Sequence, residues 1–417
     1  MSDSTIHRSE AVETLDRLMV TPGATENEVA YAAEALSLED LGAYSYGAFL
    51  MNMHSVFSGR RSYGEIVQLA REATLARVVR GWVFHKRLRL GDRKLVEPTV
   101  PREMTDAVDR LHERGRGVMT VSFHQGQFRN MATDLSMAGK RSVIALAQDA
   151  YDDFENSRAH SPDFELWEHM NITNVEDTAG GIALAKAMRR KETVIVLPDG
   201  NTGSDGPKGD ENRREVDILG RTAFIKDGAF KLAARFGVPI LPGYGFGPED
   251  NPELIMEAPI DPGGPLKGEE ADAFVDHAIR ELYAVQFARN VETHPGEWES
   301  CGLFHRWRKP EAARLSKPGL EGMDLGMVLE EGRALRRDEI QFVEIVQPDA
   351  TVWTHARSMK SMRFQGSDRK LISRLSAEEG VDRCWLDSLD PDTRKHYIDV
   401  LSALGQRHVL RAMSVAS

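Results

Sequence analysis

One histidine of this chain lies where acid-base chemistry is expected. His124 stands in the segment FHQGQFRN (residues 123–130), directly after a short apolar run. A neutral imidazole there could take a proton from an attacking hydroxyl or amine, which is worth roughly 10²–10⁴-fold in rate. A histidine that only bonds the backbone of its loop would show the same pattern. Position alone leaves both interpretations open.

A second polar segment, LPDGNTG (residues 197–203), follows another apolar run and contains Asp199 and Asn201. A carboxylate at this place could orient the imidazole of His124, bind a polar acceptor, or cap the next element. We take Asp199 as the second candidate catalytic residue and Asn201 as a candidate substrate-binding residue.

Gly220 and Arg221 precede a predicted helix that ends in KLAARFG (residues 231–237). The planar guanidinium of an arginine can hold a carboxylate or a phosphate through two parallel hydrogen bonds. We therefore count Gly220 and Arg221 as candidates for substrate binding, with a solvated arginine as the plainer alternative.

The segment FHRWRK (residues 304–309) is both basic and aromatic, and Arg306 lies at its centre. Such a cluster could grip an anionic group of a substrate. Packing of Trp298 and Trp307 in the core explains the aromatic residues equally well. Arg306 is retained as a substrate-binding candidate.

The elements that position these residues alternate between strand and helix. Short apolar runs predict strands, and amphipathic spacing predicts helices. The predicted strands are 117–123, 143–147, 193–197, 238–241 and 254–256, and the predicted helices are 180–190, 227–236 and 269–292. This alternation predicts an α/β fold with a largely parallel central sheet, in which polar residues after the strands meet at the carboxyl edge.

The N-terminal region, residues 1–64, has helical spacing of its apolar residues. Residues 41–59 carry no acidic or basic side chain, which favours a buried helix over a surface that binds a membrane or an acyl chain. The first residues lack a signal-peptide pattern, and no run reaches the roughly 18 apolar residues of a spanning helix. We expect a soluble, cytoplasmic protein.

The C-terminal region is predicted to be a separate module. Residues 310–322 contain two prolines and two glycines, which is typical of a linker. The expected division is therefore 1–64, 65–310 for the α/β domain, and 323–417 for a small α+β module. Its predicted order of two strands (341–346 and 351–353) and two helices (368–378 and 392–404) loosely resembles winged-helix domains that recognise peptides or carriers. Presenting a carrier protein and mediating a homodimer are alternative roles.

Composition and charge narrow the classes of partner. The chain has 417 residues and a formal net charge of −12, of which −11 lies in the first 310 residues. This acidic balance disfavours nucleic acid as the main partner and disfavours a basic membrane-docking surface. Two cysteines are too few for a disulfide framework or a cysteine-rich metal site. Motifs for nucleotide phosphates, dinucleotides and zinc are absent, so no metal or cofactor is expected.

Four segments in one order resemble the lipid A biosynthesis (late) acyltransferase family, within the lysophospholipid acyltransferase superfamily. They are VSFHQGQFRN, VLPDGNTG, ILGRTAFIKDGAFKLAARFGVPILP and HPGEWESCGLFHRWRKP, and the likeness spans about residues 65–310. The resemblance implies that His124 is the catalytic histidine of an HxxxxD/E motif. It also implies that Asp199 belongs to the proline-acid motif and that Gly220 and Arg221 form the glycine-arginine pair. Family members transfer an acyl group from an acyl carrier protein or coenzyme A thioester to a hydroxyl or amine, without a covalent acyl-enzyme.

The chain departs from the family pattern at three points. Arg129 stands where the family has the acid of the HxxxxD/E motif, and an arginine cannot accept a hydrogen bond from the imidazole. As a nearby positive charge, Arg129 would instead lower the pKa of His124 or bind an anionic substrate group. Asn201 replaces a second acid of the proline-acid motif. The membrane-spanning N-terminus common in the family is missing, and a C-terminal module is added.

These observations favour an acyltransferase that acts on a small hydroxyl or amine acceptor outside the membrane, in a specialised biosynthetic reaction, with His124 as base and Asp199 as its orienter. Three alternatives stay open. The first is a peripheral enzyme that acylates a lipid or glycolipid. The second is transfer from an aminoacyl-tRNA to a small amine, which the net charge disfavours. The third is a non-catalytic carrier-binding scaffold, in which Arg129 marks the loss of the catalytic pair.

Overall fold

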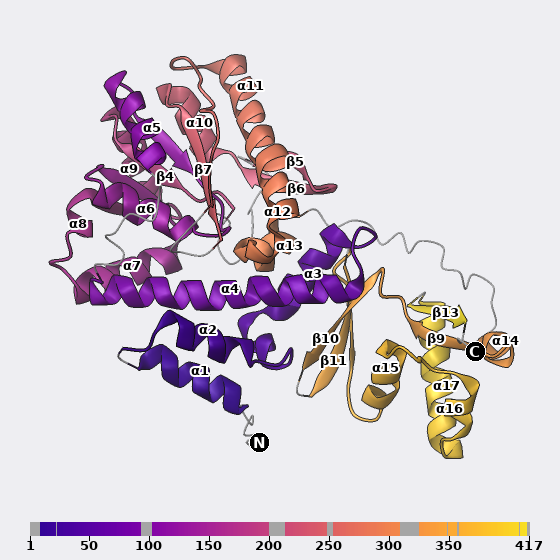
Figure 1. Ribbon diagram of the computed structural model, residues 1–417. Coiled ribbons are helices and arrows are strands. Elements are labelled where there is room, and N and C mark those ends of the chain that lie inside the picture. Colours follow the sequence, from indigo (N-terminus) through magenta and orange to yellow (C-terminus); the bar gives the residue numbers. More distant parts are fainter. Residues whose placement is uncertain are drawn as a thin grey trace. The chain divides into compact units, whose positions relative to one another are not determined.

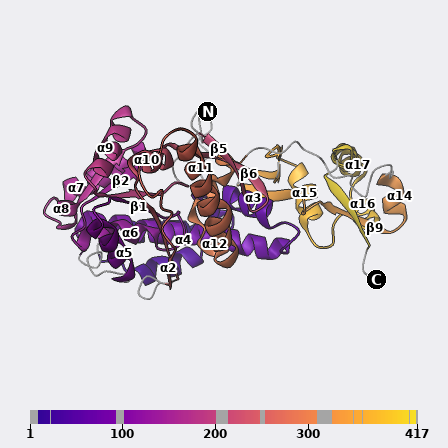
Figure 2. The ribbon, with the colours of Figure 1, turned by 90° about the horizontal axis from the view of Figure 1, so that it is seen from above.

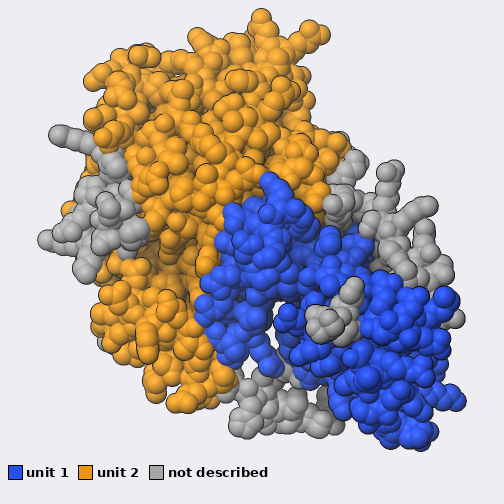
Figure 3. Space-filling view, turned by 45° about the vertical axis from the view of Figure 1, so that its right-hand side comes forward, with its two compact units in different colours: residues 1–8, 36–71, 310–417 blue, residues 9–35, 72–309 orange. Residues whose placement is uncertain are grey.

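The computed structural model divides into two compact units (Figure 3). Unit 1 contains residues 1–8, 36–71 and 310–417, and unit 2 contains residues 9–35 and 72–309. The residues described are 9–414 without 22, 93–101, 200–212, 248–252, 309–324, 348, 357 and 408. The predicted linker, 310–322, lies outside the described residues.

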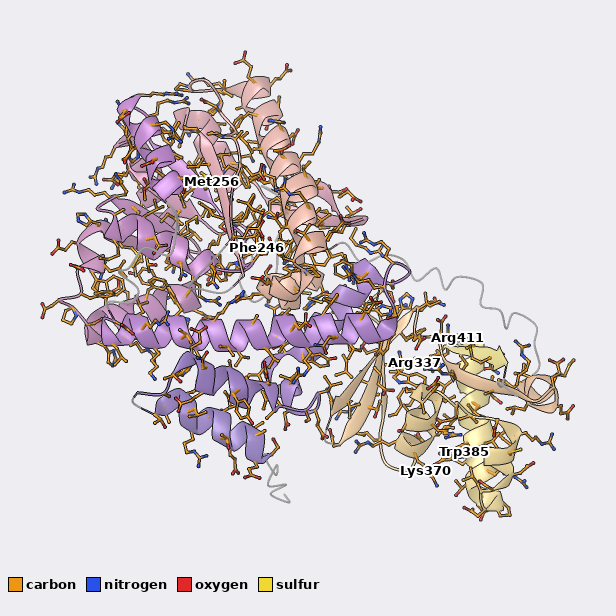
Figure 4. The ribbon with its side chains drawn as sticks, in the orientation of Figure 1. Phe246, Met256, Arg337, Lys370, Trp385 and Arg411 are labelled. Carbon is orange, nitrogen blue, oxygen red and sulfur yellow. The ribbon has the colours of Figure 1, made fainter. Side chains whose placement is uncertain are left out.

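Unit 2 is built on a six-stranded sheet with the strand order β3-β2-β4-β1-β7-β8. All neighbours pair in parallel except β8, which is antiparallel to β7. The strands are β1 (Val118–Val121), β2 (Ser142–Leu146), β3 (Met170–Asn174), β4 (Thr193–Val196), β7 (Ile240–Phe246) and β8 (Glu253–Met256). The structure thus confirms the predicted α/β fold with a largely parallel sheet. Phe246 and Met256 mark the last two strands in Figure 4.

Helices cover both faces of this sheet, with α9 and α10 on one side and α5 and α6 on the other (Figure 2). The helices are α5 (Arg102–Glu113), α6 (Phe128–Met137), α7 (Gln148–His160), α8 (Leu166–His169), α9 (Thr178–Arg189) and α10 (Gly228–Phe236). Gly237 ends α10 in the left-handed conformation, at φ 66°, as a helix-terminating glycine does. Apolar residues of the strands, such as Ile144 and Ile195, pack with Leu135 of α6 into one buried cluster.

Unit 2 also contains a hairpin and a run of helices after the sheet. Strands β5 (Arg213–Ile218) and β6 (Arg221–Lys226) pair antiparallel in a two-stranded sheet of their own. One continuous helical segment follows, made of α11 (Gly268–Ile279), the π-helical η4 (Arg280–Phe287) and α12 (Ala288–Thr293). It matches the helix predicted for residues 269–292. The short helices η5 (Pro295–Glu297), η6 (Glu299–Leu303) and α13 (Phe304–Trp307) complete the unit.

The N-terminal region is helical, as predicted (Figure 1). It contains α1 (Glu10–Val20), α2 (Glu26–Glu34), η1 (Asp40–Tyr44), α3 (Tyr46–Phe57) and α4 (Tyr63–Leu90), and the boundary between the units falls inside α4. Ten residues of α3 are buried, which agrees with a buried helix at residues 41–59. Among the described helices, none is long and apolar enough to cross a membrane.

The C-terminal part of unit 1 is an α+β module. It holds two antiparallel sheets, one of order β10-β11-β12 and one that pairs β9 with β13. The strands are β9 (Arg333–Arg337), β10 (Phe342–Gln347), β11 (Ala350–His355), β12 (Ser361–Phe364) and β13 (Leu410–Ser414), and the helices are α14 (Leu325–Glu330), α15 (Asp368–Ser376), α16 (Arg383–Asp387) and α17 (Pro391–Gln406). Trp353 and Leu371 lie in its core. Arg337 and Arg411, labelled in Figure 4, mark the β9–β13 pair.

Candidate active site

The central pair of the sheet brings two of the predicted site residues together. Strands β1 and β4 are parallel neighbours, and Val121 at the end of β1 is the register partner of Val196 at the end of β4. His124 and Asp199 each lie three residues beyond these partners. Since parallel strands end at the same edge of a sheet, the two side chains leave that edge side by side.

His124 and Asp199 form a hydrogen-bonded pair. Nδ1 of His124 lies 2.8 Å from Oδ1 of Asp199, and the backbone N–H of His124 donates to Oδ2 at 2.8 Å. The Asp199 side chain is fully buried, whereas 29% of the His124 side chain is exposed. The carboxylate is thus enclosed and the imidazole is reachable from solvent.

This geometry fixes which ring nitrogen can act as a base. An ionised carboxylate only accepts hydrogen bonds, so Nδ1 of His124 carries the proton and donates to Asp199. In the neutral ring the lone pair is then on Nε2. Within the described part of the chain, Nε2 has no hydrogen-bond partner. Of the three roles considered for Asp199, orienting the imidazole is the one that these two hydrogen bonds support.

A segment distant in the sequence holds the loop after His124. The backbone N–H groups of Glu299 and Ser300 both donate to the carbonyl of His124, at 2.9 and 3.2 Å. The carbonyl of Glu297 accepts the N–H of Gly126 at 3.1 Å. His124 is therefore held through its N–H by Asp199 and through its carbonyl by residues 299–300.

Gly126 is required by this packing. Its φ is +56°, and a Cβ atom at this position would lie 2.0 Å from the carbonyl oxygen of Gly245. No L-residue with a side chain fits so close to a backbone atom, so only glycine allows the loop to approach β7.

Aromatic rings form the base of the site. Phe123, next to His124, packs on Tyr283 and Phe287 with ring centroids 5.0 and 4.7 Å apart. Burial raises the pKa of Tyr283 well above its ordinary value, and the charge of Asp199 adds to this effect. On the other side, the rings of His124 and Phe128 lie 4.5 Å apart. The imidazole thus contacts the ring of Phe128, and its chain neighbour Phe123 is anchored among buried aromatic rings.

Arg129 does not face the imidazole as an orienting acid would. Its guanidinium donates to Glu299 at 2.6 Å, and only 2% of the Glu299 side chain is exposed. Arg80 of α4 joins the same cluster, at 3.0 Å from Glu297 and 3.7 Å from Glu299. Ion pairs therefore link the first turn of α6 and the middle of α4 to residues 297–299.

The predicted site residues beyond His124, Asp199 and Arg129 are Gly220, Arg221, Arg306 and Asn201, and none of them has a described hydrogen bond to His124 or Asp199. Gly220 and Arg221 lie at the turn of the β5–β6 hairpin, where the Gly220 N–H donates to Asp217 and the Arg221 guanidinium donates to the Gly220 carbonyl. Arg306 is close enough to Arg77 of α4 for its charge to lower the Arg77 pKa, after the larger effect of burial. Asn201 lies outside the described residues.

The aromatic residues of the last motif belong to the core. Trp298 and Trp307 are 0% and 1% exposed. The indole N–H of Trp298 donates to Ser300 at 3.0 Å, within the segment that holds the His124 carbonyl. Packing thus explains the tryptophans, and the basic residues of the segment remain as candidates for binding an anion.

The sequence reasoning did not single out Arg80, Glu297 or Glu299. Glu297 and Glu299 lie in the HPGEWES part of the fourth motif, so the sequence marked their segment, but it indicated no function for either glutamate. Arg80 lies in the middle of a 28-residue helix and has no local signal. No group of three or more potential metal ligands occurs among the described residues. No protein-family model and no curated protein matches this chain.

Proposed function

We propose that this protein is an acyltransferase that moves an acyl group from a thioester, on an acyl carrier protein or coenzyme A, to a hydroxyl or amine. The hydrogen-bonded pair of His124 and Asp199 is the observation that carries this proposal. It supplies a general base whose proton-accepting nitrogen is fixed and reachable. The four ordered segments of the sequence support acyl transfer as the class of reaction.

In the proposed reaction Nε2 of His124 takes the proton of the acceptor hydroxyl or amine as its oxygen or nitrogen attacks the thioester carbonyl. The tetrahedral intermediate collapses, the carbon–sulfur bond breaks, and the imidazolium returns the proton to the departing thiolate. The products are the ester or amide and the free thiol. Asp199 stabilises the transient imidazolium through the hydrogen bond to Nδ1.

The retained pair also bears on the scaffold alternative. That alternative rested on the replacement of the family's acid by Arg129. Asp199 supplies a carboxylate to the same imidazole, from the end of the neighbouring strand. A fully buried carboxylate that orients a partly exposed histidine favours catalysis over carrier binding alone.

The test is release of thiol from acyl-coenzyme A thioesters of short and long chain, followed with a thiol-reactive dye. Hydroxylamine, an amino-acid mixture and lysophospholipid vesicles serve as separate acceptors. We expect acceptor-dependent release by the wild type, its loss in His124→Ala, and unchanged release in the control His277→Ala, an exposed histidine of α11. Equal release by the wild type and His124→Ala would remove His124 from the mechanism.

A further inference from the structure

A small pocket opens beside the loop that follows His124. Its lining includes Arg80, Val83 and Phe84 of α4 together with Gly126, Arg129 and Asn130. The cavity volume is about 20 Å³, which is room for roughly one water-sized group. A pocket of this size can take the polar end of a ligand, whereas an acyl chain does not fit.

Two hydrogen-bond donors of this lining have no acceptor. Nδ2 of Asn130 is buried without a partner, and the residue is 6% exposed. Nη1 of Arg80 is also buried without a hydrogen bond, since its nearest carboxylate oxygen, on Glu299, lies 3.7 Å away. A buried donor left unpaired costs about 1–3 kcal/mol, so native structures rarely keep two together without reason. An anion bound in the pocket would offer acceptor oxygens to these donors.

The charges around the pocket favour an anion. Arg77, Arg80, Arg129 and Arg306 lie in one electrostatic neighbourhood, in which Glu297 and Glu299 supply the opposing charge. Glu26, which also lines the pocket, is paired with Arg87 at 3.6 Å. The lining itself holds two arginines, Arg80 and Arg129, and one acidic residue, Glu26. Guanidinium groups recognise carboxylates with paired, charge-assisted hydrogen bonds.

We propose that this pocket binds a carboxylate of the substrate, through Arg80, Arg129 and the amide of Asn130. Since Arg129 and Asn130 come five and six residues after His124, the proposal places the carboxylate in the same molecule as the attacking group. The acyl acceptor is then a small amino or hydroxy acid. The identity of the acyl acceptor rests on the proposed function, whereas carboxylate binding by the pocket can be tested separately.

Acetate is the probe, and saturation-transfer NMR of its methyl protons is the measurement, at constant ionic strength. The most useful variant is Asn130→Ala, because it removes a donor that is unpaired in the free protein and so should not destabilise the fold. We expect it to weaken acetate binding by about tenfold, the worth of one hydrogen bond to a charged group. Arg129→Gln should weaken binding at least as much. Arg235→Gln, an exposed arginine of α10, is the matched control and should bind as the wild type does.

Different experimental outcomes would refute the carboxylate pocket and the acyl-transfer reaction. His124→Ala should still bind acetate, because His124 is not part of the pocket lining. Absence of wild-type binding, or equal binding by Asn130→Ala and wild type, would overturn the carboxylate pocket even if thiol release is observed. Tighter displacement of acetate by inorganic phosphate would overturn the carboxylate assignment. Acetate binding with the expected variant pattern but without thiol release would leave the pocket intact and refute acyl transfer.

Discussion

His124 and Asp199 are joined by two hydrogen bonds of 2.8 Å, one from the imidazole Nδ1 and one from the backbone N–H of the same histidine. The carboxylate therefore fixes both the ring and the main chain that bears it. It does so from the end of an adjacent parallel strand, because β1 and β4 are in register.

Asp199→Asn should reduce thiol release while leaving the fold intact. An asparagine has one acceptor oxygen where two N–H groups of His124 need one each, so its NH₂ group faces one of them. The favoured ring tautomer then places a proton on Nε2. We expect a loss of about 10²–10⁴-fold in kcat, against no change in the exposed control Asp163→Asn. Full activity in Asp199→Asn would show that Asp199 does not orient the base.

Glu299→Gln should destabilise unit 2 by about 1–3 kcal/mol, because Arg129 and Arg80 keep their charges without the buried carboxylate. Chemical denaturation measures the change in the free energy of unfolding. The double variant Arg129→Gln/Glu299→Gln should recover part of the loss. Additive losses in the double variant would mean that the ion pair contributes nothing specific.

Gly126→Ala should cost more than Gly139→Ala. Both glycines have positive φ, but the space beside Gly139 is open whereas a Cβ on Gly126 meets the Gly245 carbonyl at 2.0 Å. The strain of the backbone conformation is common to both, roughly 1–2 kcal/mol. The clash should add about 1–3 kcal/mol at Gly126 only. Equal unfolding free energies for the two variants would contradict the close approach of the loop to β7.

The stability of unit 1 should fall as the pH is lowered below 6.5. Burial lowers the pKa of His54 to about 4. The hydrogen bond to the Glu339 carbonyl and the charges of Asp338 and Glu339 raise the pKa, whereas the charge of Arg337 lowers it further. Since the unfolded state binds the proton more readily, the stability from neutral His54 is complete above pH 6.5 and is lost progressively towards pH 4. The expected loss from this group at pH 5 is about 2 kcal/mol.

Thermal unfolding of the wild type and His54→Gln, followed between pH 7.5 and 5, measures this contribution. The glutamine keeps a donor for the Glu339 carbonyl but has no group that titrates. The wild type should lose more stability than the variant over this range. A parallel decrease in the two proteins would exclude His54 as the source.

The sequence predicted the sheet well because its signals are local. Residues 117–123 and 193–197 are continuous apolar runs, as expected of strands that are covered on both faces. Strands with mixed or polar residues escaped prediction: β3 reads MNITN, and β5 reads RREVDI in a hairpin. The pairing of β9 with β13 joins residues more than 70 positions apart, for which no spacing rule exists.

The site residues likewise divide into those with a local signal in the sequence and those without one. His124 and Asp199 each follow a strand, so their places at the sheet edge were predictable, and orientation of the imidazole was among the roles foreseen for Asp199. The pairing of Arg129 with Glu299 spans 170 positions and was not foreseen. It depends on the loop after β1 meeting residues 297–300, a contact that only the folded chain creates. From the sequence, Arg129 is therefore interpreted as the replacement of an acid, whereas in the structure it forms an ion pair with Glu299.

The central claim is that Asp199 fixes the tautomer of His124, with the proton on Nδ1 and the lone pair on Nε2. The most direct measurement is ¹⁵N NMR of the imidazole nitrogens in the wild-type protein, with His124→Ala used to assign the signals. We expect the Nδ1–H tautomer for His124 at neutral pH and its loss in Asp199→Asn. An Nε2–H tautomer in the wild type, or the same tautomer in both proteins, would contradict the account.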